Sequence, residues 1–366
     1  MITSAYIHIP FCRSKCNYCS FVSGINIDKK TGYLYSLLKE IDYYYDKTPL
    51  KTLYIGGGTP SLMEINELSK IISKFCFTDN PEITIEVNPN DVNTEYMTGL
   101  KNLGFNRLSM GAQSFDDNIL KIIGRRHNSE EIYKAVEISK NAGFENISLD
   151  LIYGLPTQTV EGFRHDLNEV INLGIKHLSL YGLKIDEGCY FYNHTPDNLP
   201  DDDTQADMYL LAGEITSQNG FEHYEVSNYS KPDYNSQHNT NYWKCGEYWG
   251  FGLAAHGYTD NVRYSNTTDI DEYLSSPTSR EFGKFLTEQE KIEERIFLGL
   301  RLSKGIEVND INNDFNIDFE KKYEKVLDKY LKSGHIEKTE NGYKLSDNKN
   351  SNGFLLSNII LADFMG

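Results

Sequence analysis

The sequence has no continuous apolar run near the ~20 residues that a membrane-spanning helix needs. Its N-terminus lacks a basic stretch followed by a long apolar core, so we expect no secretory signal and a cytoplasmic location. Basic residues are also scarce, with 36 Lys and Arg against 53 Asp and Glu and a formal net charge of −17. Because sequence-independent nucleic-acid binding needs a cationic surface, this balance argues against a nucleic-acid partner.

Cysteine is scarce as well, and its placement is uneven. A secreted disulfide scaffold would be shorter and denser in cysteine, so reduced thiols fit better. Of the six cysteines, three lie within a single segment of eight residues, and the other three are isolated. The clustered residues are Cys12, Cys16 and Cys19, and the isolated ones are Cys76, Cys189 and Cys245. Three clustered thiols in a cytoplasmic chain indicate a metal site.

Short runs of Ile, Leu, Val and Tyr alternate with amphipathic stretches through the first half of the chain. The runs predict strands at 4–9, 52–55, 83–87, 107–110, 147–152 and 177–181, and the stretches predict helices at 33–45, 65–75, 93–103, 129–142 and 160–173. Strand–helix alternation at this spacing predicts parallel strands joined by right-handed crossovers. We therefore expect an α/β fold, an incomplete (β/α)6 barrel of the TIM type, over residues 1–185.

The pattern changes after about residue 186. An extension rich in Tyr, Trp, Gly, Asn and His is expected over 186–284, with a helix over 208–219. A helix from Thr287, a helix over 319–331 and a hairpin of 335–337 with 342–345 follow. They predict a small winged-helix-like module over 285–366. The acidic charge favours a structural cap over a nucleic-acid reader.

The clustered cysteines have the spacing C-x3-C-x2-C directly after the first predicted strand. Three thiolates can hold three irons of a 4Fe–4S cubane, whereas electron-transfer clusters normally use four cysteines. The missing fourth ligand would leave one iron open to a substrate. Zinc is the competing interpretation, but zinc sites usually show a second cysteine pair, and this chain has none. A purely structural role is the third alternative.

Several motifs together resemble the radical S-adenosylmethionine (SAM) superfamily, in particular the group of the oxygen-independent coproporphyrinogen III oxidase. They are YIHIPFC (6–12) through CSF (19–21), YIGGGTPS (54–61), IEVNP (85–89), RLSMGAQSF (107–115), residues 120–127, DLIYGLP (150–156) and HNTNYW (238–243). The resemblance spans nearly the whole chain. It implies a 4Fe–4S cluster on Cys12, Cys16 and Cys19, with SAM bound at the open iron.

Two departures place the chain within this group. The oxidase has a further cysteine where this chain has Phe21, and it has a longer N-terminal extension. In these departures and in the HNxxYW motif, the chain resembles the heme chaperone branch of the group, HemW. Members of that branch bind heme and pass it to recipient proteins. The oxidase remains the alternative, and a heme or metal-storage protein with a structural cluster is a third. As a chaperone, the chain needs no catalytic residue of its own.

The resemblance also implies which residues contact SAM. Arg125 suits the methionine carboxylate, because its guanidinium fork matches a carboxylate. Glu86, Asp150 and Gln113 suit the amine or the ribose hydroxyls, with a structural ion pair or helix cap as the alternative for each. The turn at Gly57, Gly58 and Thr59 would let backbone groups approach the amine, and Tyr6 and Tyr18 are weaker candidates.

Heme is expected in the aromatic-rich segment. His238 would ligate the iron and Trp243 would wall the ring, with His256 and Cys245 as other ligands of suitable type. Packing of these aromatics against the barrel is the alternative interpretation. The resemblance further implies heme-accepting proteins as partners and an electron donor such as a flavodoxin or ferredoxin. Peripheral association with membranes is expected where recipients lie there.

Overall fold

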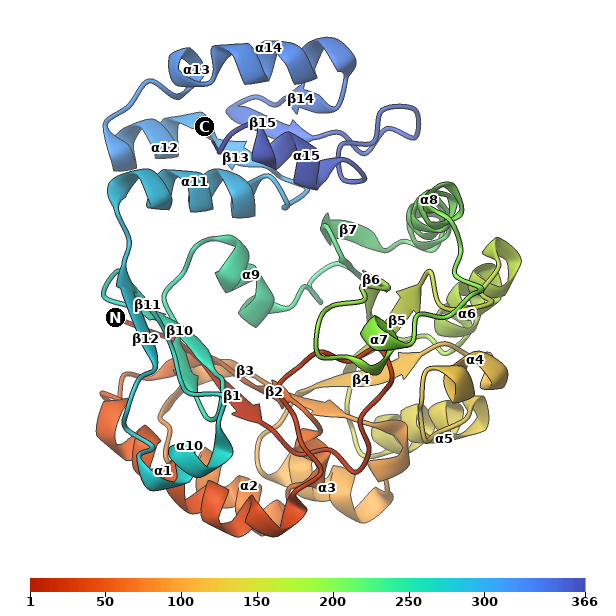
Figure 1. The fold of residues 1–366 in the computed structure, drawn as a ribbon, viewed down its shortest axis with the longest axis vertical. Coiled ribbons are helices and arrows are strands. Elements are labelled where there is room, and N and C mark those ends of the chain that lie inside the picture. Colours follow the sequence, from red (N-terminus) through yellow and green to blue (C-terminus); the bar gives the residue numbers. More distant parts are fainter. Residues whose placement is uncertain (366) are drawn as a thin grey trace.

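The computed structural model describes residues 1–365, and its centre is a curved sheet of nine strands (Figure 1). Strands β1 to β6 are parallel and lie side by side in the order of the sequence. Their bounds are Ser4–Ile9, Leu50–Gly57, Phe77–Val87, Arg107–Gln113, Asn146–Tyr153 and His177–Gly182. All six predicted strands are confirmed, and β3 begins earlier than its apolar run because polar residues also pair with β2.

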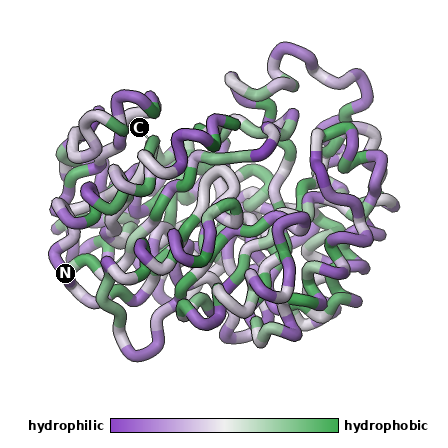
Figure 2. The backbone as a smooth tube through the Cα atoms, turned by 90° about the horizontal axis from the view of Figure 1, so that it is seen from below, coloured by the Kyte–Doolittle hydropathy of each residue, from purple (hydrophilic) through white to green (hydrophobic). Residues whose placement is uncertain are grey.

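Helices connect these strands and cover the outer face of the sheet (Figure 1). The predicted helices are confirmed as α1 Lys30–Tyr44, α2 Ile65–Ile72, α3 Thr94–Asn102, α5 Ser129–Asn141 and α6 Val160–Asn172. Gly104 and Gly143 end α3 and α5 with φ of 93° and 89°, a conformation that glycine adopts without strain. Figure 2 shows hydrophobic segments gathered toward the middle of the molecule, as amphipathic helices require.

Between β1 and β5, four short helices were not expected, because each is too short to show a helical period. They are α4 Asp117–Ile122 and the 3-10 helices Ile27–Lys29, Pro60–Leu62 and Pro89–Asp91. Helix α4 begins at the side chain of Asp116, which accepts hydrogen bonds from the backbone N–H groups of Asn118 and Ile119. The loop that carries the three clustered cysteines, residues 10–24 (the cysteine loop), packs against the end of this helix.

The barrel stays open, as predicted, and both of its edges are extended by later strands. Antiparallel β8 (Asn228–Ser230) adds to β6 and carries β7 (Glu222–Glu225), while β9 (Trp249–Phe251) pairs in parallel with β1. The sheet therefore continues past residue 185, where the sequence predicts a boundary. The other elements of the extension are α7 Tyr190–Asn193, α8 Asp202–Gln218, α9 Gln237–Trp243, α10 Ile270–Ser275 and an antiparallel sheet of β10 His256–Thr259, β11 Val262–Ser265 and β12 Phe282–Phe285.

A buried carboxylate fastens this extension to the barrel. Glu40 of α1 is fully buried and accepts hydrogen bonds from the backbone of Gly252 and the side chains of Asn266 and Tyr273. Arg280 completes the network at 3.3 Å from the same carboxylate. Four donors from residues 252–280 of the extension therefore meet one residue of α1.

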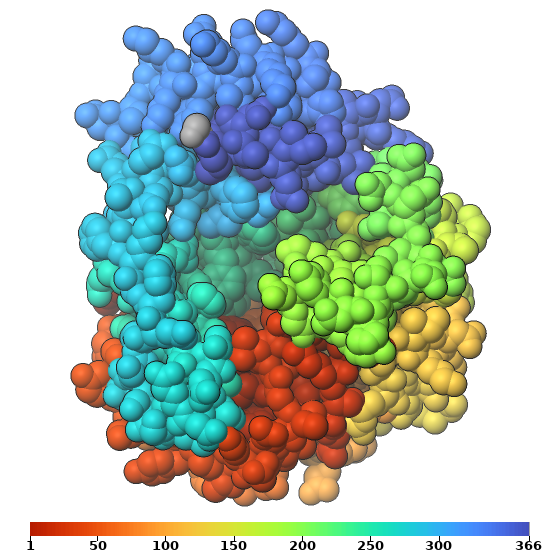
Figure 3. Space-filling view, viewed as in Figure 1, coloured from red at the N-terminus to blue at the C-terminus, as the bar shows by residue number. Residues whose placement is uncertain are grey.

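The C-terminal module has a hydrophobic core of its own, over residues 292–364, which Tyr209 of α8 joins and against which Tyr153 and Val226 pack. The expected hairpin is confirmed, whereas the single helix expected over 319–331 is two helices that meet at Tyr323. Figure 3 shows a hollow on this face between the barrel and the module (blue). Within residues 1–365, no helix combines the length and apolarity needed to cross a membrane. The elements of the C-terminal module are α11 Glu288–Gly299, β13 Ile306–Glu307, α12 Val308–Phe315, α13 Phe319–Lys322, α14 Glu324–Ser333, β14 Ile336–Lys338, β15 Gly342–Leu345 and α15 Ser357–Ala362.

Candidate cofactor site at the barrel mouth

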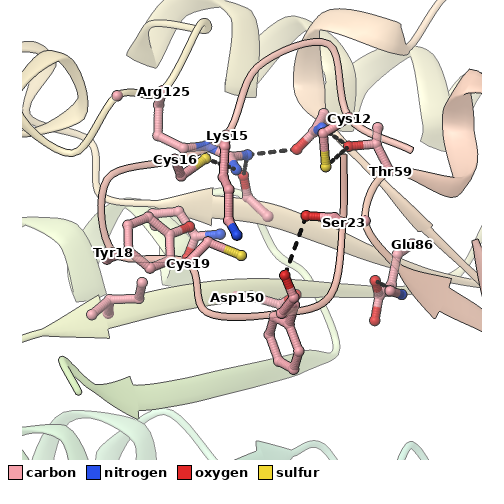
Figure 4. Close-up of a pocket in the computed structure, with 18 of the residues that line it drawn as sticks. Cys12, Lys15, Cys16, Tyr18, Cys19, Ser23, Thr59, Glu86, Arg125 and Asp150 are labelled. Carbon is pink, nitrogen blue, oxygen red and sulfur yellow. Dashed lines mark hydrogen bonds between the residues drawn. The ribbon is translucent and has the colours of Figure 1, made fainter. Parts of the chain in front are cut away.

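A cavity of about 510 Å³ opens at the carboxyl ends of the parallel strands. Its walls are the cysteine loop and the segments that follow β2 to β6 (Figure 4). Functional residues of barrels gather at this end because each strand delivers its following loop there.

The cysteine loop leaves β1 and is closed at its base by backbone hydrogen bonds. The N–H of Cys12 donates to the carbonyl of Gly24 at 2.9 Å, and the N–H of Gly24 donates to Pro10 at 2.8 Å. Nε2 of His8 lies 2.8 Å from the carbonyl oxygen of Val22. The two ends of the loop are therefore held together before any ligand binds.

The middle of the loop is anchored from the other side of the cavity. Asn17 donates from its backbone to Ile123 at 3.0 Å and from its side chain to Ile122 at 2.8 Å. Its own carbonyl accepts from the N–H of Phe191 in α7 at 2.9 Å. These contacts fix the segment between Cys16 and Cys19.

The three thiols are free, half-buried and line the same cavity (Figure 4). Thr59 donates to the sulfur of Cys12 and Arg125 to the sulfur of Cys16, each at 3.5 Å. No three His, Cys, Asp or Glu side chains of residues 1–365 converge on one metal ion, which disfavours a zinc site built on a single atom. A cubane takes each thiolate on a different iron, so thiols that share a cavity without meeting suit a 4Fe–4S cluster.

The glycine turn after β2 packs closely against the protein itself. A Cβ on Gly57, whose φ is 113°, would lie 2.6 Å from the ring of His8, and one on Gly58 would lie 2.8 Å from the carbonyl oxygen of Phe11. The N–H of Gly57 donates to Glu86 at 3.0 Å. These glycines line the cavity, but the structure gives them a second reason to be small.

Two half-buried carboxylates reach the cavity from β3 and β5. Glu86 accepts from the hydroxyl of Tyr54 at 2.9 Å, and Asp150 accepts from Ser109 at 3.2 Å. Burial raises the pKa of Glu86 to about 7 and that of Asp150 to about 6. Neither forms an ion pair with any basic side chain of residues 1–365. The structure therefore offers no ion pair that would explain them as purely structural.

Gln113 and Arg125 come from the end of β4 and the turn after α4. Gln113 has a φ of 70° at a register shift of β4, a left-handed conformation that is uncommon outside glycine. Arg125 donates to the side chain of Asn88 and to the carbonyl of Gly111, both at 2.6 Å. No carboxylate of residues 1–365 pairs with its guanidinium, so its charge is open to an anionic ligand.

The two tyrosines predicted for the SAM site differ in their placement. Tyr18 lines the cavity, whereas Tyr6 does not: its hydroxyl lies 3.1 Å from Nδ1 of His8, and its ring stacks on Tyr54. Sequence analysis missed Tyr54, Asn88, Ser109 and Tyr181, which line the cavity. Two-residue alternation could have found Tyr54 and Ser109, because each lies on the same strand face as a neighbour predicted for the site.

Comparison with known proteins agrees with this geometry. The radical SAM superfamily model matches residues 6–170, and the HemN C-terminal domain model matches residues 286–348. Heme chaperone HemW of Lactococcus lactis is 39% identical over 85% of this chain and 84% of its own, and that of Bacillus subtilis is 34% identical over 99% of both. The chain belongs to the HemW family. Coproporphyrinogen III oxidase (HemN) from Escherichia coli shares the fold, with a TM-score of 0.86 and 23% identity over 99% of this chain and 89% of that one.

The second residue after the third cysteine is Phe21, where the resemblance to the oxidase implies a further cysteine in that enzyme. Phe21 lines the cavity and is 67% exposed. The aromatic ring therefore gives the mouth of the cavity an apolar edge where a further thiol was expected in an oxidase.

The segment predicted to bind heme lies on α9, outside the lining of the cavity. His238 is 1% exposed, and its Nδ1 lies 2.8 Å from the hydroxyl of Thr52 and its Nε2 2.7 Å from that of Tyr242. Burial lowers the pKa of His238 to about 3, and its ring stacks on Tyr54 at 5.3 Å. Both nitrogens have partners, so an iron atom reaches Nε2 only if Tyr242 moves away.

The other candidates differ in exposure. Trp243 is half-buried, and His256 is exposed at the start of β10. Burial raises the pKa of the Cys245 thiol to about 11, which disfavours the thiolate that iron would need.

Proposed function

We propose that this radical SAM protein is a heme chaperone that carries a 4Fe–4S cluster and SAM, binds heme and delivers it to recipient proteins. The observation that carries the proposal is one cavity with three free thiols, an arginine without a carboxylate partner and two half-buried carboxylates without a basic partner among residues 1–365. An iron–sulfur cluster with one open iron and a zwitterionic ligand is complementary to that set.

Each thiolate of Cys12, Cys16 and Cys19 would hold one iron. Arg125 would bind the methionine carboxylate, while Glu86 and Asp150 would accept hydrogen bonds from the amine and the ribose hydroxyls. Gln113, Thr59 and Tyr18 would complete the SAM site. When bound, cluster and SAM together supply one-electron reduction of the sulfonium and a carbon-centred radical. The chain's own residues bind and orient the ligand and shield it from solvent.

Several partners follow from this function. The relatives at 30–39% identity are named heme chaperones, which supports heme and heme-accepting proteins as partners. Reduction of the cluster would need an electron donor such as a flavodoxin or ferredoxin. A peripheral membrane association would arise through recipients that lie at the membrane.

The test is to give anaerobic, reconstituted protein heme and coproporphyrinogen III in separate experiments. We expect stable heme binding, transfer of heme to an apo-acceptor, and no conversion of coproporphyrinogen with SAM and a reductant. Catalytic formation of protoporphyrinogen IX would refute the chaperone proposal and establish the oxidase alternative. Heme that binds but never leaves would instead indicate storage.

His238 and Trp243 form the proposed heme site, and their geometry supplies a sharp test. Metal-bound histidines usually hold their second nitrogen in a hydrogen bond, as Thr52 holds Nδ1 here. Only Tyr242 then competes with iron at Nε2. We expect Tyr242→Phe to strengthen heme binding, and His238→Ala to weaken it and shift the absorption band of the heme.

Trp243→Ala should weaken heme binding through lost packing, and cluster content should stay constant in all three variants. Heme spectra that remain identical in His238→Ala, with a lower free energy of unfolding, would identify His238 as a structural residue. His256→Ala would then be the next variant to titrate with heme.

A further inference from the structure

The interior of the barrel holds an unusual charge below the cavity. Arg107, the first residue of β4, is the largest of the fully buried side chains and is 1% exposed. Barrel interiors are usually filled by branched apolar side chains. An arginine in this position therefore needs a reason.

The guanidinium of Arg107 has few partners. Its Nη2 lies 3.4 Å from Nδ1 of His177, while Nε and Nη1 have no hydrogen-bond partner among residues 1–365. Thr84, which faces Arg107 across the β3–β4 register, also has an unpaired hydroxyl. A charge that is buried without a partner destabilises the folded state strongly. A cation kept at that cost must act on something near it.

The strand register places Arg107 below the two carboxylates that are proposed to bind SAM, two residues before the β4 partner of Glu86 and four residues before that of Asp150. Arg107 and Ser109 are two residues apart on β4 and share a face, and Ser109 donates to Asp150 in the cavity. On β3, Thr84 pairs with Arg107 and Glu86 pairs with Ser109. The cation therefore lies beneath both carboxylates, within the same water-poor interior.

Other titratable groups around Arg107 do not take over its role. Burial and the charge of Arg107 lower the pKa of His177 and His238, so both imidazoles are neutral. Glu82 accepts from two backbone N–H groups of α9, and Glu225 accepts from Ser227 and Asn228. The remaining groups are two tyrosines and the two cavity carboxylates, namely Tyr54, Tyr224, Glu86 and Asp150. Burial raises the pKa of each, and the positive charge of Arg107 opposes that rise.

We propose that Arg107 is a positioning residue of the cofactor site, an internal counter-charge that favours the ionised forms of Glu86 and Asp150, which are the forms that bind the amine and ribose of SAM. The inference rests on the proposed function, because SAM is the ligand that needs those carboxylates charged. Arg107 does not line the cavity and acts on the ligand only through its neighbours.

The experiment is calorimetric titration of reconstituted protein with SAM between pH 6 and pH 9, for wild type, Arg107→Met and Arg107→Lys. Without the cation, the two carboxylates should bind protons more tightly. If SAM binds only the ionised carboxylate, the affinity for SAM falls about tenfold for each pH unit below the pKa of that carboxylate. We expect Arg107→Met to bind SAM about tenfold more weakly than wild type at pH 7 and to regain affinity at pH 9. Arg107→Lys should keep most of the wild-type profile.

A parallel pH profile in Arg107→Met and wild type would overturn the inference and leave Arg107 a structural residue. If the methionine variant does not fold, Arg107→Gln keeps a hydrogen-bond donor for His177 without the charge, and the same comparison decides. Absence of SAM binding in wild type at every pH would refute the proposed function itself. Binding in wild type with no pH shift in the variants refutes only the role of Arg107.

Discussion

Replacing Cys12, Cys16 or Cys19 by alanine is expected to abolish the visible absorbance of the anaerobically reconstituted protein and its bound iron. The three thiols line one cavity, and no fourth cysteine lines it with them. Because a cubane held by three thiolates already has one open iron, loss of another leaves too few bonds to retain it. Absorbance near the cluster bands and iron analysis measure the effect.

The other cysteines serve as matched controls. Cys76, which is exposed, Cys189 and Cys245 all lie outside the cavity lining, so their alanine variants should keep the wild-type iron content. Loss of the cluster in any of these three, or a full spectrum in a variant of the clustered three, contradicts the assignment.

Arg125→Ala should cause the second large effect, a loss of SAM affinity with the cluster still present. Removing one partner of a buried charge pair costs ~2–5 kcal/mol. That range is a loss of about 30- to 4,000-fold in affinity, at 1.4 kcal/mol for each factor of ten. Calorimetry with SAM, on protein of verified iron content, measures it.

Iron content must be verified because Arg125 also donates to the sulfur of Cys16. The neighbouring Arg126 is exposed and lines the same cavity, so Arg126→Ala is the matched control and should change affinity little. Unchanged SAM affinity in Arg125→Ala would make Arg125 a brace between Asn88, Gly111 and the cysteine loop.

Local periodicity predicted most of the fold. The strands β1 to β6 are short apolar runs that are buried on both faces, and each connecting helix carries one apolar stripe. Each of these elements can therefore be recognised from its own residues alone. Helix α4 and the sheet of β10, β11 and β12 could not be predicted in this way. The helix is six residues long. The strands of the small sheet are four residues each, and β12 pairs with β11 across the intervening helix α10.

The site residues likewise differ in whether the local sequence could predict them. Motif residues such as Cys12 and Glu86 lie at or just beyond strand ends, and parallel strands bring those ends together. The left-handed backbone of Gln113 and the buried guanidinium of Arg107 depend on neighbours from other strands. Equally, the sequence of α9 cannot show that Thr52 of β2 seals one side of His238.

Tyr54 belongs to both proposed sites at once. Its hydroxyl donates to Glu86 at the cavity, while its ring stacks on His238 of α9. A ligand that moves this tyrosine at one end must change the free energy of binding at the other. Linkage then requires reciprocity: the factor by which SAM alters the affinity for heme equals the factor by which heme alters the affinity for SAM. A chaperone built around such a shared side chain can hold its cargo in one state of the cofactor and yield it in another.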